Sequence, residues 1–232
     1  RWHATMHYNQ NPGGWNGFAT LSDFYGKFEA TDKRRGDAYT GVTNVTGMRV
    51  GLLFGQQVDQ NGVLLKDRKG GNLSFTKAVK AVETDPATLE VTGIRVVKYP
   101  PDYNNGDNVN NDFVIFRLAD VLLMKAEAIL RGGTATNVAP YGATALSIVN
   151  YVRTHSSRGA SSLASLNLDQ LLDERGRELY WEGWRRMDLI RFGKFLQAGQ
   201  IRKTTSPEAR LLFPVPAQQI AANPNLTQNP GY

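Results

Sequence analysis

Residues 174–195, ERGRELYWEGWRRMDLIRFGKF, carry the strongest structural signal in this chain. Side chains three or four positions apart are neighbours on a helix, and acids and bases recur here at that spacing, as Glu174 and Arg177 do. Trp181 and Trp184 are set among them. The pattern predicts an amphipathic helix that carries many ion pairs. The charged side chains of this stretch and its flank are Asp173, Glu174, Arg175, Arg177, Glu178, Glu182, Arg185, Arg186, Asp188 and Arg191.

The start and the end of this helix are indicated by capping residues. Asn167 and Gln170 have the spacing of a capping box, in which each side chain bonds to the backbone of the other. Gly183 is expected to interrupt the helix, and a second, shorter helical face from Trp184 is expected to close at Gly193. The apolar face of the first helix is predicted to consist of Leu168, Leu171, Leu172 and Leu179.

Glu178 and Glu182 could be compared with a catalytic carboxylate pair. Glycoside hydrolysis needs two carboxylates, usually on opposite sides of the scissile bond and roughly 5–10 Å apart. Two glutamates at i and i+4 of one helix instead point in the same direction, and Glu182 can meet Arg185 or Arg186. The spacing favours a structural role. Substitution of Glu178 or Arg185 is therefore expected to lower thermal stability and to leave ligand affinity intact.

Composition excludes several classes of protein and of site. Hydrophobic residues make up 41% of the 232 residues and charged residues 21%, which is typical of a globular protein. The absence of cysteine excludes disulfides, thiolate metal sites and cysteine nucleophiles. The formal net charge is +6, but Lys and Arg are dispersed, whereas nucleic-acid binding needs clustered positive charge. We therefore expect no nucleic-acid partner. No apolar run approaches the roughly 20 residues that span a bilayer.

Two further helices are predicted upstream of the charged stretch. Residues 113–131 are apolar almost all round, with Asp112 as the expected cap, so this helix should be buried on several sides. Residues 142–155 carry apolar side chains at helical spacing. Together they should form an antiparallel hairpin of about the length of a tetratricopeptide unit. Since about three such pairs make a stable stack, they should pack on the N-terminal region or on helices that precede this sequence.

The first 112 residues are expected to be rich in loops. A short helix is predicted over residues 22–28, with Ser22 as its cap. Turn-forming residues separate short apolar runs that are typical of strands or extended segments. These runs are residues 50–54, 63–65, 73–76 and 94–98.

The sequence predicts neither a metal site nor a cofactor site. His3 and His7 are four positions apart, as in a zinc-binding helix, but the glutamate that follows the first histidine of metalloproteases is missing. Residues 102–112, DYNNGDNVNND, lack the glycine and glutamate positions of an EF-hand loop. The chain also lacks the G-x-S-x-G turn of serine hydrolases and the phosphate-binding Gly-x4-Gly-Lys frame.

Aromatic and amide side chains near the N-terminus are the candidate ligand-binding residues. Trp2, Tyr8 and Trp15 are interleaved with Asn9 and Asn16 in a segment that has neither helical nor strand periodicity. An aromatic ring face can pack on the C–H side of a pyranose, while amides bond to its hydroxyls. The segment therefore predicts glycan binding. The alternative is that these rings fill the core beneath an irregular loop, since most large aromatic residues are buried.

Five segments of the chain resemble the SusD/RagB family. The three specific ones are FRLADVLLMKAEAILRGG at 116–133, the charged stretch at 174–195, and the tail LLFPVPAQQIAANPNLTQNPGY at 211–232. Two further segments, residues 7–36 and the GIRVVKYP run at 93–100, extend the resemblance over nearly the whole chain.

The resemblance implies a mainly α fold of tetratricopeptide-like helix pairs, with long irregular loops and a few short strands. It implies that residues 1–232 are the C-terminal portion of a SusD/RagB-like domain: a loop-rich region at 1–112, a helical region at 113–200 and a C-terminal tail at 201–232. It further implies a lipoprotein on the outer face of a Bacteroidetes outer membrane, held by a lipid anchor on an absent N-terminal half. Such proteins bind glycans or peptides and form a lid on a SusC-like TonB-dependent transporter.

Family members do not cleave their ligands, so the resemblance implies no catalytic residue and no cofactor. It assigns the charged stretch to the scaffold. Family glycan sites use loop aromatics that differ between members, so no ligand residue transfers by motif. The glycan-binding residues predicted from composition are Trp2, Tyr8, Asn9, Trp15 and Asn16. Two alternatives remain: a module that docks on the transporter while the N-terminal half binds the ligand, and, more weakly, an enzyme.

Overall fold

The computed structural model describes residues 2–11, 13–36, 51–59, 61–99, 110 and 112–232. It divides into two compact units, residues 1–183 (unit 1) and residues 184–232 (unit 2), and each is described by itself. The division follows Gly183, the residue at which the sequence predicts an interruption. Gly183 has a φ of 89°, a conformation that glycine adopts without steric cost.

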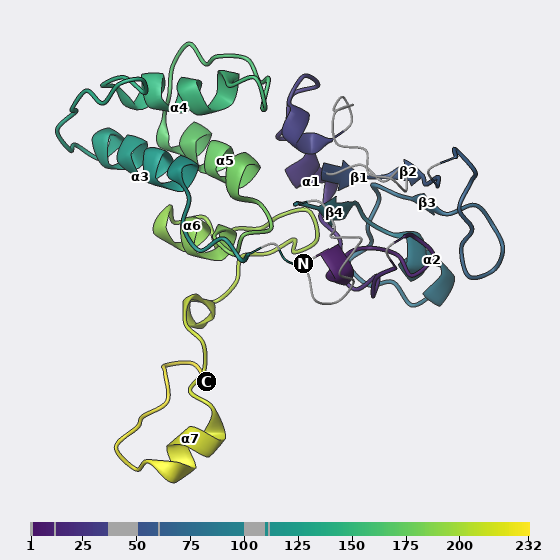
Figure 1. Ribbon diagram of the computed structural model, residues 1–232. Helices are drawn as coiled ribbons and strands as arrows, with labels where there is room; N and C mark the ends of the chain where they lie inside the picture. Colours follow the sequence, from purple (N-terminus) through teal and green to yellow (C-terminus); the bar gives the residue numbers. More distant parts are fainter. Residues whose placement is uncertain (1, 12, 37–50, 60, 100–109, 111) are drawn as a thin grey trace. The chain divides into compact units, whose positions relative to one another are not determined.

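Unit 1 has short elements in its first part and longer helices in its second part (Figure 1). β1 pairs antiparallel with β4, and β2 pairs antiparallel with β3. The described residues thus confirm a mainly α fold with a few short strands. In chain order the elements are η1 (Trp2–Ala4), α1 (Ser22–Tyr25), η2 (Lys33–Arg35), β1 (Gly51–Leu53), β2 (Gly55–Gln56), β3 (Ser74–Phe75), α2 (Pro86–Val91), β4 (Arg95–Val97), α3 (Leu118–Leu130), α4 (Ala145–Thr154) and α5 (Leu168–Leu179).

The first part of unit 1 differs from the prediction at several boundaries. The helix predicted over 22–28 ends at Tyr25, and Leu21 rather than Ser22 occupies its N-cap position, without a side-chain capping bond. The run predicted over 63–65 as a strand or an extended segment forms no named strand, but Leu64 makes an isolated antiparallel bridge to Val58. Residue 50 and most of the loop 102–112 lie outside the described residues.

The helix α2 was not predicted, although its signals are in the sequence. Asp85 accepts a hydrogen bond from the backbone N–H of Ala87, and Pro86 occupies the first helical position, where its missing N–H has no cost. This six-residue helix carries Glu90, a buried acid of the site described below.

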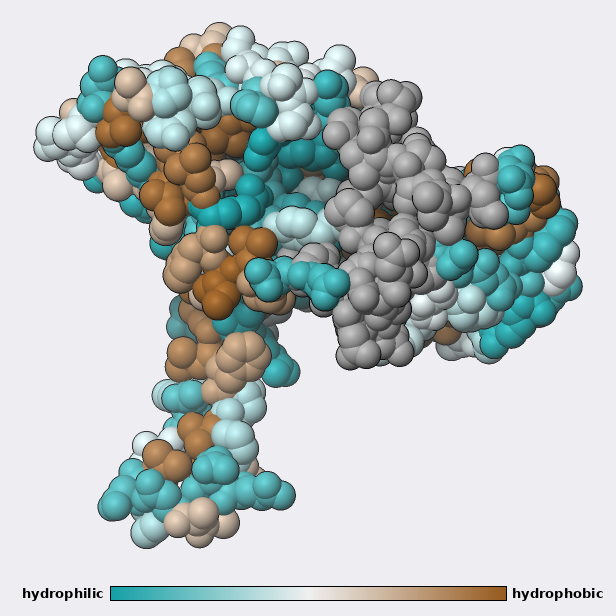
Figure 2. Space-filling model, viewed as in Figure 1, coloured by the Kyte–Doolittle hydropathy of each residue, from teal (hydrophilic) through white to brown (hydrophobic). Residues whose placement is uncertain are grey.

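The helix α3 begins later than predicted and is buried on one face. Arg117 is its N-cap residue, so the prediction of Asp112 as the cap is wrong. Leu122 and Leu123 are buried, whereas Leu118 is 57% exposed and Val121 50% exposed. The prediction of burial on several sides is therefore wrong within the described residues. Figure 2 shows hydrophobic atoms on the surface where α3 lies in Figure 1. None of the described helices combines the length and the hydropathy that a bilayer crossing requires.

The helices α4 and α5 begin at capping boxes, and both pack with α3. The predicted box of Asn167 and Gln170 is confirmed, with bonds of 2.9 Å in both directions. Thr144 and Ser147 form a second box at the start of α4. α3 packs against α4, as the predicted hairpin requires, and also against α5.

An aromatic core joins the first part of unit 1 to the end of α5. Tyr25 and Phe28 pack with Tyr180, whose hydroxyl donates to the carbonyl of Arg34 at 2.8 Å. The strands β1 and β4 contribute Leu52 and Val96, which lie opposite each other in the register. This core ties the sheet residues to the charged helix α5.

Unit 2 contains α6 (Arg185–Arg191), η3 (Glu208–Leu211) and α7 (Ala217–Ala222). Arg186 places its guanidinium 4.9 Å from the ring centre of Phe195 and 4.3 Å from that of Phe213. The side-chain amide of Gln228 accepts from the N–H of Val215 and donates to its carbonyl, at 2.7 and 2.9 Å. The tail is thus held by specific polar contacts.

Candidate functional site

Residues 2–11 and 13–18, called here the Trp15 loop, fold back on themselves. The backbone N–H of Trp15 donates to the carbonyl of His3 at 2.7 Å. Gly14 permits this close approach, since a Cβ at that position would lie 2.6 Å from the carbonyl oxygens of both His3 and Met6. Met6 is fully buried beneath the loop. The backbone of the loop therefore holds Trp15 in a defined position.

The rings of Trp15 and Tyr8 lie at the surface of this loop. Trp15 is 76% exposed and Tyr8 45% exposed, so neither ring fills the core. The ring of His3 lies 5.9 Å from that of Trp15, centre to centre. Phe18 is also exposed, and its ring meets Trp181 edge to face at 6.3 Å. Trp2 lies in η1 of the same loop.

The two predicted amides occupy different environments. Asn9 is exposed, and its Nδ2 donates to the carbonyl of Lys66 at 2.8 Å. Asn16 is half-buried: its Nδ2 donates to the carbonyl of Glu90 at 2.8 Å, and its Oδ1 accepts from the Nε of Arg95 at 2.9 Å. Both polar atoms of the Asn16 amide therefore bond within the protein.

Glu90 of α2 connects the Trp15 loop to the rest of unit 1. Its Oε1 accepts from the hydroxyl of Tyr8 at 2.6 Å and from the backbone N–H of Arg68 at 2.7 Å. The same oxygen lies 2.9 Å from Nε2 of His7. Burial by itself raises the pKa of Glu90, but these bonds to the carboxylate outweigh it and hold the pKa at about 2. Glu90 is thus an ionised anchor for Tyr8.

His7 is a neutral structural residue of the same cluster. Burial lowers its pKa, against the opposing effect of Glu90. Its Nδ1 accepts from the N–H of Asn9 at 3.0 Å, which leaves Nε2 as the nitrogen that donates to Glu90. Since both ring nitrogens are bonded within the protein, His7 is not available to a metal with His3.

We expect Asn16→Ala to destabilise unit 1 by about 2–4 kcal/mol. The change removes a hydrogen bond to buried Arg95, and it places alanine at the φ of 52° that Asn16 adopts. Asn9→Ala is the matched control and should cost less than about 1 kcal/mol, because Asn9 is exposed. Urea unfolding of the two variants measures the difference. Equal unfolding midpoints would contradict the structural role of Asn16.

The low pKa of Glu90 predicts a loss of stability in acid. Because this pKa is about 2 in the folded chain and 4.5 in the reference state, the stabilisation is present above pH 4.5 and is lost as the pH falls towards 2. Other carboxylates contribute to acid unfolding as well. The difference in melting temperature between wild type and Glu90→Gln isolates this residue and should shrink over the same window. A constant difference would show that Glu90 is not ionised in the fold.

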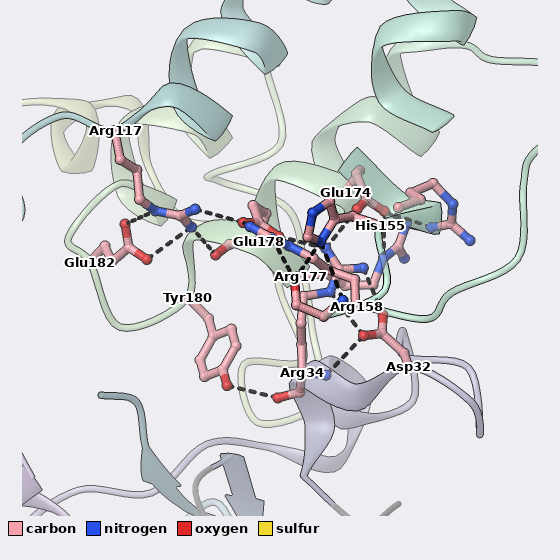
Figure 3. A network of polar contacts seen from close by, with 12 residues as sticks. Asp32, Arg34, Arg117, His155, Arg158, Glu174, Arg177, Glu178, Tyr180 and Glu182 are labelled. Atoms are coloured by element: carbon pink, nitrogen blue, oxygen red, sulfur yellow. Dashed lines mark hydrogen bonds and ion pairs between the residues drawn. The ribbon is translucent and has the colours of Figure 1, made fainter. Parts of the chain in front are cut away.

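The charged helix α5 carries a network of buried ion pairs (Figure 3). Glu178 accepts from Nη1 of Arg34 at 2.9 Å, from Nη1 of Arg117 at 2.6 Å and from Nη2 of Arg158 at 2.7 Å. Glu182 accepts from Nε of Arg117 at 2.9 Å. One carboxylate thus holds together three segments that are far apart in the sequence.

Glu174 extends this network along the same helix. It accepts from Arg177 at 2.7 Å, which confirms the pair predicted from helical spacing. It also accepts from Nη1 of Arg34 at 2.7 Å and from Nη1 of Arg153 at 2.6 Å. All of these carboxylates are buried, so the network is part of the interior of unit 1.

The network excludes Glu178 and Glu182 as an acid–base pair. Burial raises the pKa of Glu178, but the guanidiniums of Arg158, Arg117 and Arg34 hold it well below its usual range. Arg117 and Lys98 lower the pKa of Glu182 in the same way. A glycosidase needs one carboxylic acid that keeps its proton. Both glutamates are ionised scaffold residues instead.

Several residues of the site were not predicted from the sequence. Glu90, Arg68 and Arg95 link the Trp15 loop to distant segments, and no local spacing indicates these contacts. The start of α2 at Asp85 and Pro86 could have placed Glu90 on a helix. Its role as the shared acceptor of Tyr8 and His7 is visible only in the structure.

Curated proteins similar to this chain are members of the SusD group. The starch-binding protein SusD of Bacteroides thetaiotaomicron is 30% identical over 168 residues, which are 66% of this chain and 28% of that protein. The SusD-like protein P38 of Formosa agariphila is 28% identical over 176 residues, or 71% of this chain and 32% of that protein. The chain thus spans about a third or less of the length of these relatives.

Solved structures with the same fold include two surface glycan-binding proteins. Surface glycan-binding protein A from Bacteroides thetaiotaomicron has a TM-score of 0.62 at 22% identity, over 99% of this chain and 46% of that one. Surface glycan-binding protein A from Bacteroides uniformis has a TM-score of 0.59 at 24% identity, over 94% of this chain and 42% of that one. The family sequence model described as the SusD family matches residues 3–206. The chain therefore belongs to the SusD family.

Proposed function

We propose that this chain is part of a non-catalytic glycan-binding protein and that Trp15 and Tyr8 form its ligand platform. The observation that carries the proposal is the ring of Trp15, which is 76% exposed although the backbone of its loop is held by hydrogen bonds. An exposed ring on a backbone that is already ordered offers its face to a ligand with little further loss of backbone entropy. Asn9 and Trp2 belong to the same loop, and Asn16 supports it from beneath.

The chemistry of the platform suits an oligosaccharide. A pyranose ring places C–H groups against an aromatic face, and its hydroxyls can bond to nearby amides. Such contacts are uncharged, so the affinity should be modest and nearly independent of salt. Two similar proteins are named for binding starch and surface glycans, which supports the same ligand class here.

The setting of this function follows from the family. We propose that the intact protein is a lipoprotein at the cell surface, anchored in the outer membrane by a lipid on its N-terminal half. It would deliver its oligosaccharide to a SusC-like TonB-dependent transporter. The short length of this chain relative to its relatives supports a ligand site completed by additional residues of the intact protein.

A panel of neutral oligosaccharides tests the proposal. The intact protein and the isolated chain are each titrated calorimetrically with starch, xylan, mannan and β-glucan fragments at low and high salt. We expect at least one fragment to bind the intact protein with an affinity that salt does not change. Release of shorter products during the titration would instead indicate an enzyme.

The second candidate function is a docking module for the transporter. It is favoured by the exposed apolar side chains of α3, including Leu118 and Val121, which no ligand role in the Trp15 loop explains. In this case the isolated chain should capture a SusC-like transporter from solubilised outer membranes and bind none of the oligosaccharides. Glycan binding by the isolated chain without capture of the transporter would favour the Trp15 platform.

A further inference from the structure

A cavity of about 270 Å³ lies between α3 and α4, within unit 1. Its apolar lining residues include Leu122 and Val152, and Tyr151 also lines it. Its basic lining residues are Arg117 and Arg158, together with His155 at the end of α4. A cavity with an apolar wall and a few convergent polar groups is the usual form of a small-molecule site.

The guanidiniums of Arg117 and Arg158 retain N–H groups that could donate hydrogen bonds to a ligand. Within the described part of the chain, the hydrogen bonds of Arg158 go to Glu178 and Ser157 and use three of its five N–H groups. Arg117 gives four bonds, all to Glu178 and Glu182. The N–H groups that remain belong to side chains on the cavity wall.

The ion-paired network beside the cavity has more cations than anions. Its cationic side chains number six and its carboxylates five among the described ion pairs, which leaves one positive charge in excess. Each of these cations has a carboxylate within 3 Å, so the excess belongs to the network as a whole and not to one unpaired side chain. The cations are Arg34, Lys98, Arg117, Arg153, Arg158 and Arg177, and the carboxylates are Glu29, Asp32, Glu174, Glu178 and Glu182.

We propose that this cavity binds a small monocarboxylate with a compact, partly apolar body. Its carboxylate would bond to Arg158 and Arg117 and would supply the negative charge that the network lacks. Its body would pack on Leu122, Val152 and the ring of Tyr151. At about 270 Å³ the cavity is slightly smaller than typical ligand pockets, so the body is limited to about one ring. A hexuronate and an aromatic acid share this chemistry. The proposal does not depend on the Trp15 platform.

His155 provides a direct readout of binding at this cavity. The chain has three histidines, so the imidazole C–H resonances of the full chain are few and can be assigned with the variant His155→Gln. The probes are glucuronate and benzoate, with glucose and benzyl alcohol as uncharged counterparts. We expect at least one carboxylate to shift the His155 resonance in a saturable manner, with millimolar affinity for so small a ligand. The uncharged counterparts should not shift it.

Variants of Arg158 test the site itself. Arg158→Gln should weaken carboxylate binding about tenfold, whereas Arg158→Lys, which keeps the charge, should weaken it by less. Unchanged His7 resonances report that unit 1 remains folded. Tyr151→Ala alters the wall without touching the ion pairs and should weaken benzoate binding if Arg158→Gln does not fold. The proposal is overturned if neither carboxylate shifts His155, if the uncharged counterparts shift it equally, or if a folded Arg158→Gln binds like wild type.

Discussion

Glu178→Gln is expected to lower the free energy of unfolding of unit 1 by about 3–5 kcal/mol. The carboxylate of Glu178 is buried and accepts hydrogen bonds from Arg34, Arg117 and Arg158. The neutral amide keeps the shape of the side chain and leaves these guanidiniums without their shared counter-charge. For a protein of this size, such a loss corresponds to a fall in melting temperature of roughly 6–20 °C, which calorimetry or circular dichroism measures.

The matched control for this variant is Asp173→Asn on the same helix. Asp173 pairs with Lys27 at 2.7 Å, but about a third of each side chain is exposed, and such surface pairs contribute less than about 1 kcal/mol. Oligosaccharide affinity of the folded Glu178→Gln protein should equal that of wild type. If the two variants melted at the same temperature, the network would not be the main stabilising feature of α5.

Trp15→Ala is expected to reduce oligosaccharide affinity about 10- to 100-fold and to leave the melting temperature nearly unchanged. Loss of one large aromatic contact at a binding surface costs about 1.5–3 kcal/mol of affinity. The ring is 76% exposed, so its removal opens no cavity in the core. Calorimetric titration of the intact protein with a fragment that binds in the panel measures the first effect, and thermal unfolding measures the second.

Trp15→Phe keeps an aromatic face at the same position and should retain part of the affinity. Comparison of Trp15→Phe with Trp15→Ala shows how much of the affinity depends on an aromatic ring at position 15. Unchanged affinity in Trp15→Ala would contradict the proposal that Trp15 binds the ligand and would favour ligand binding elsewhere in the intact protein. Membership of the SusD family would not be affected by that result.

The parts of the fold that depend on neighbours in the sequence could be predicted. Asn167 and Gln170 form the predicted capping box, and Glu174 pairs with Arg177 as helical spacing requires. Gly193 takes a left-handed conformation just after α6, as predicted, whereas α5 ends at Leu179, four residues before the predicted interruption at Gly183. Each of these features depends on side chains and backbone within one or two turns of each other, so the local sequence contains the whole signal.

The parts that depend on distant segments could not be predicted. The partners of Glu178 come from positions 34, 117 and 158, and helical spacing suggests only neighbours such as Arg185 for the adjoining Glu182. The late start of α3 has the same origin: Arg117 precedes the helix in an extended conformation and its side chain bonds to Glu178 and Glu182. The exposure of Trp15 likewise results from the way its loop folds back, and no periodic pattern in the sequence indicates it.

The long sequence separations in the ion-paired network also determine how unit 1 unfolds. Arg34 and Glu178 are 144 positions apart, and we therefore expect their contact to form late in folding. Contacts made after the rate-limiting step of folding act mainly on the unfolding rate. We therefore expect the network to stabilise unit 1 kinetically. Its loss should accelerate unfolding and proteolysis while the rate of refolding stays close to that of wild type.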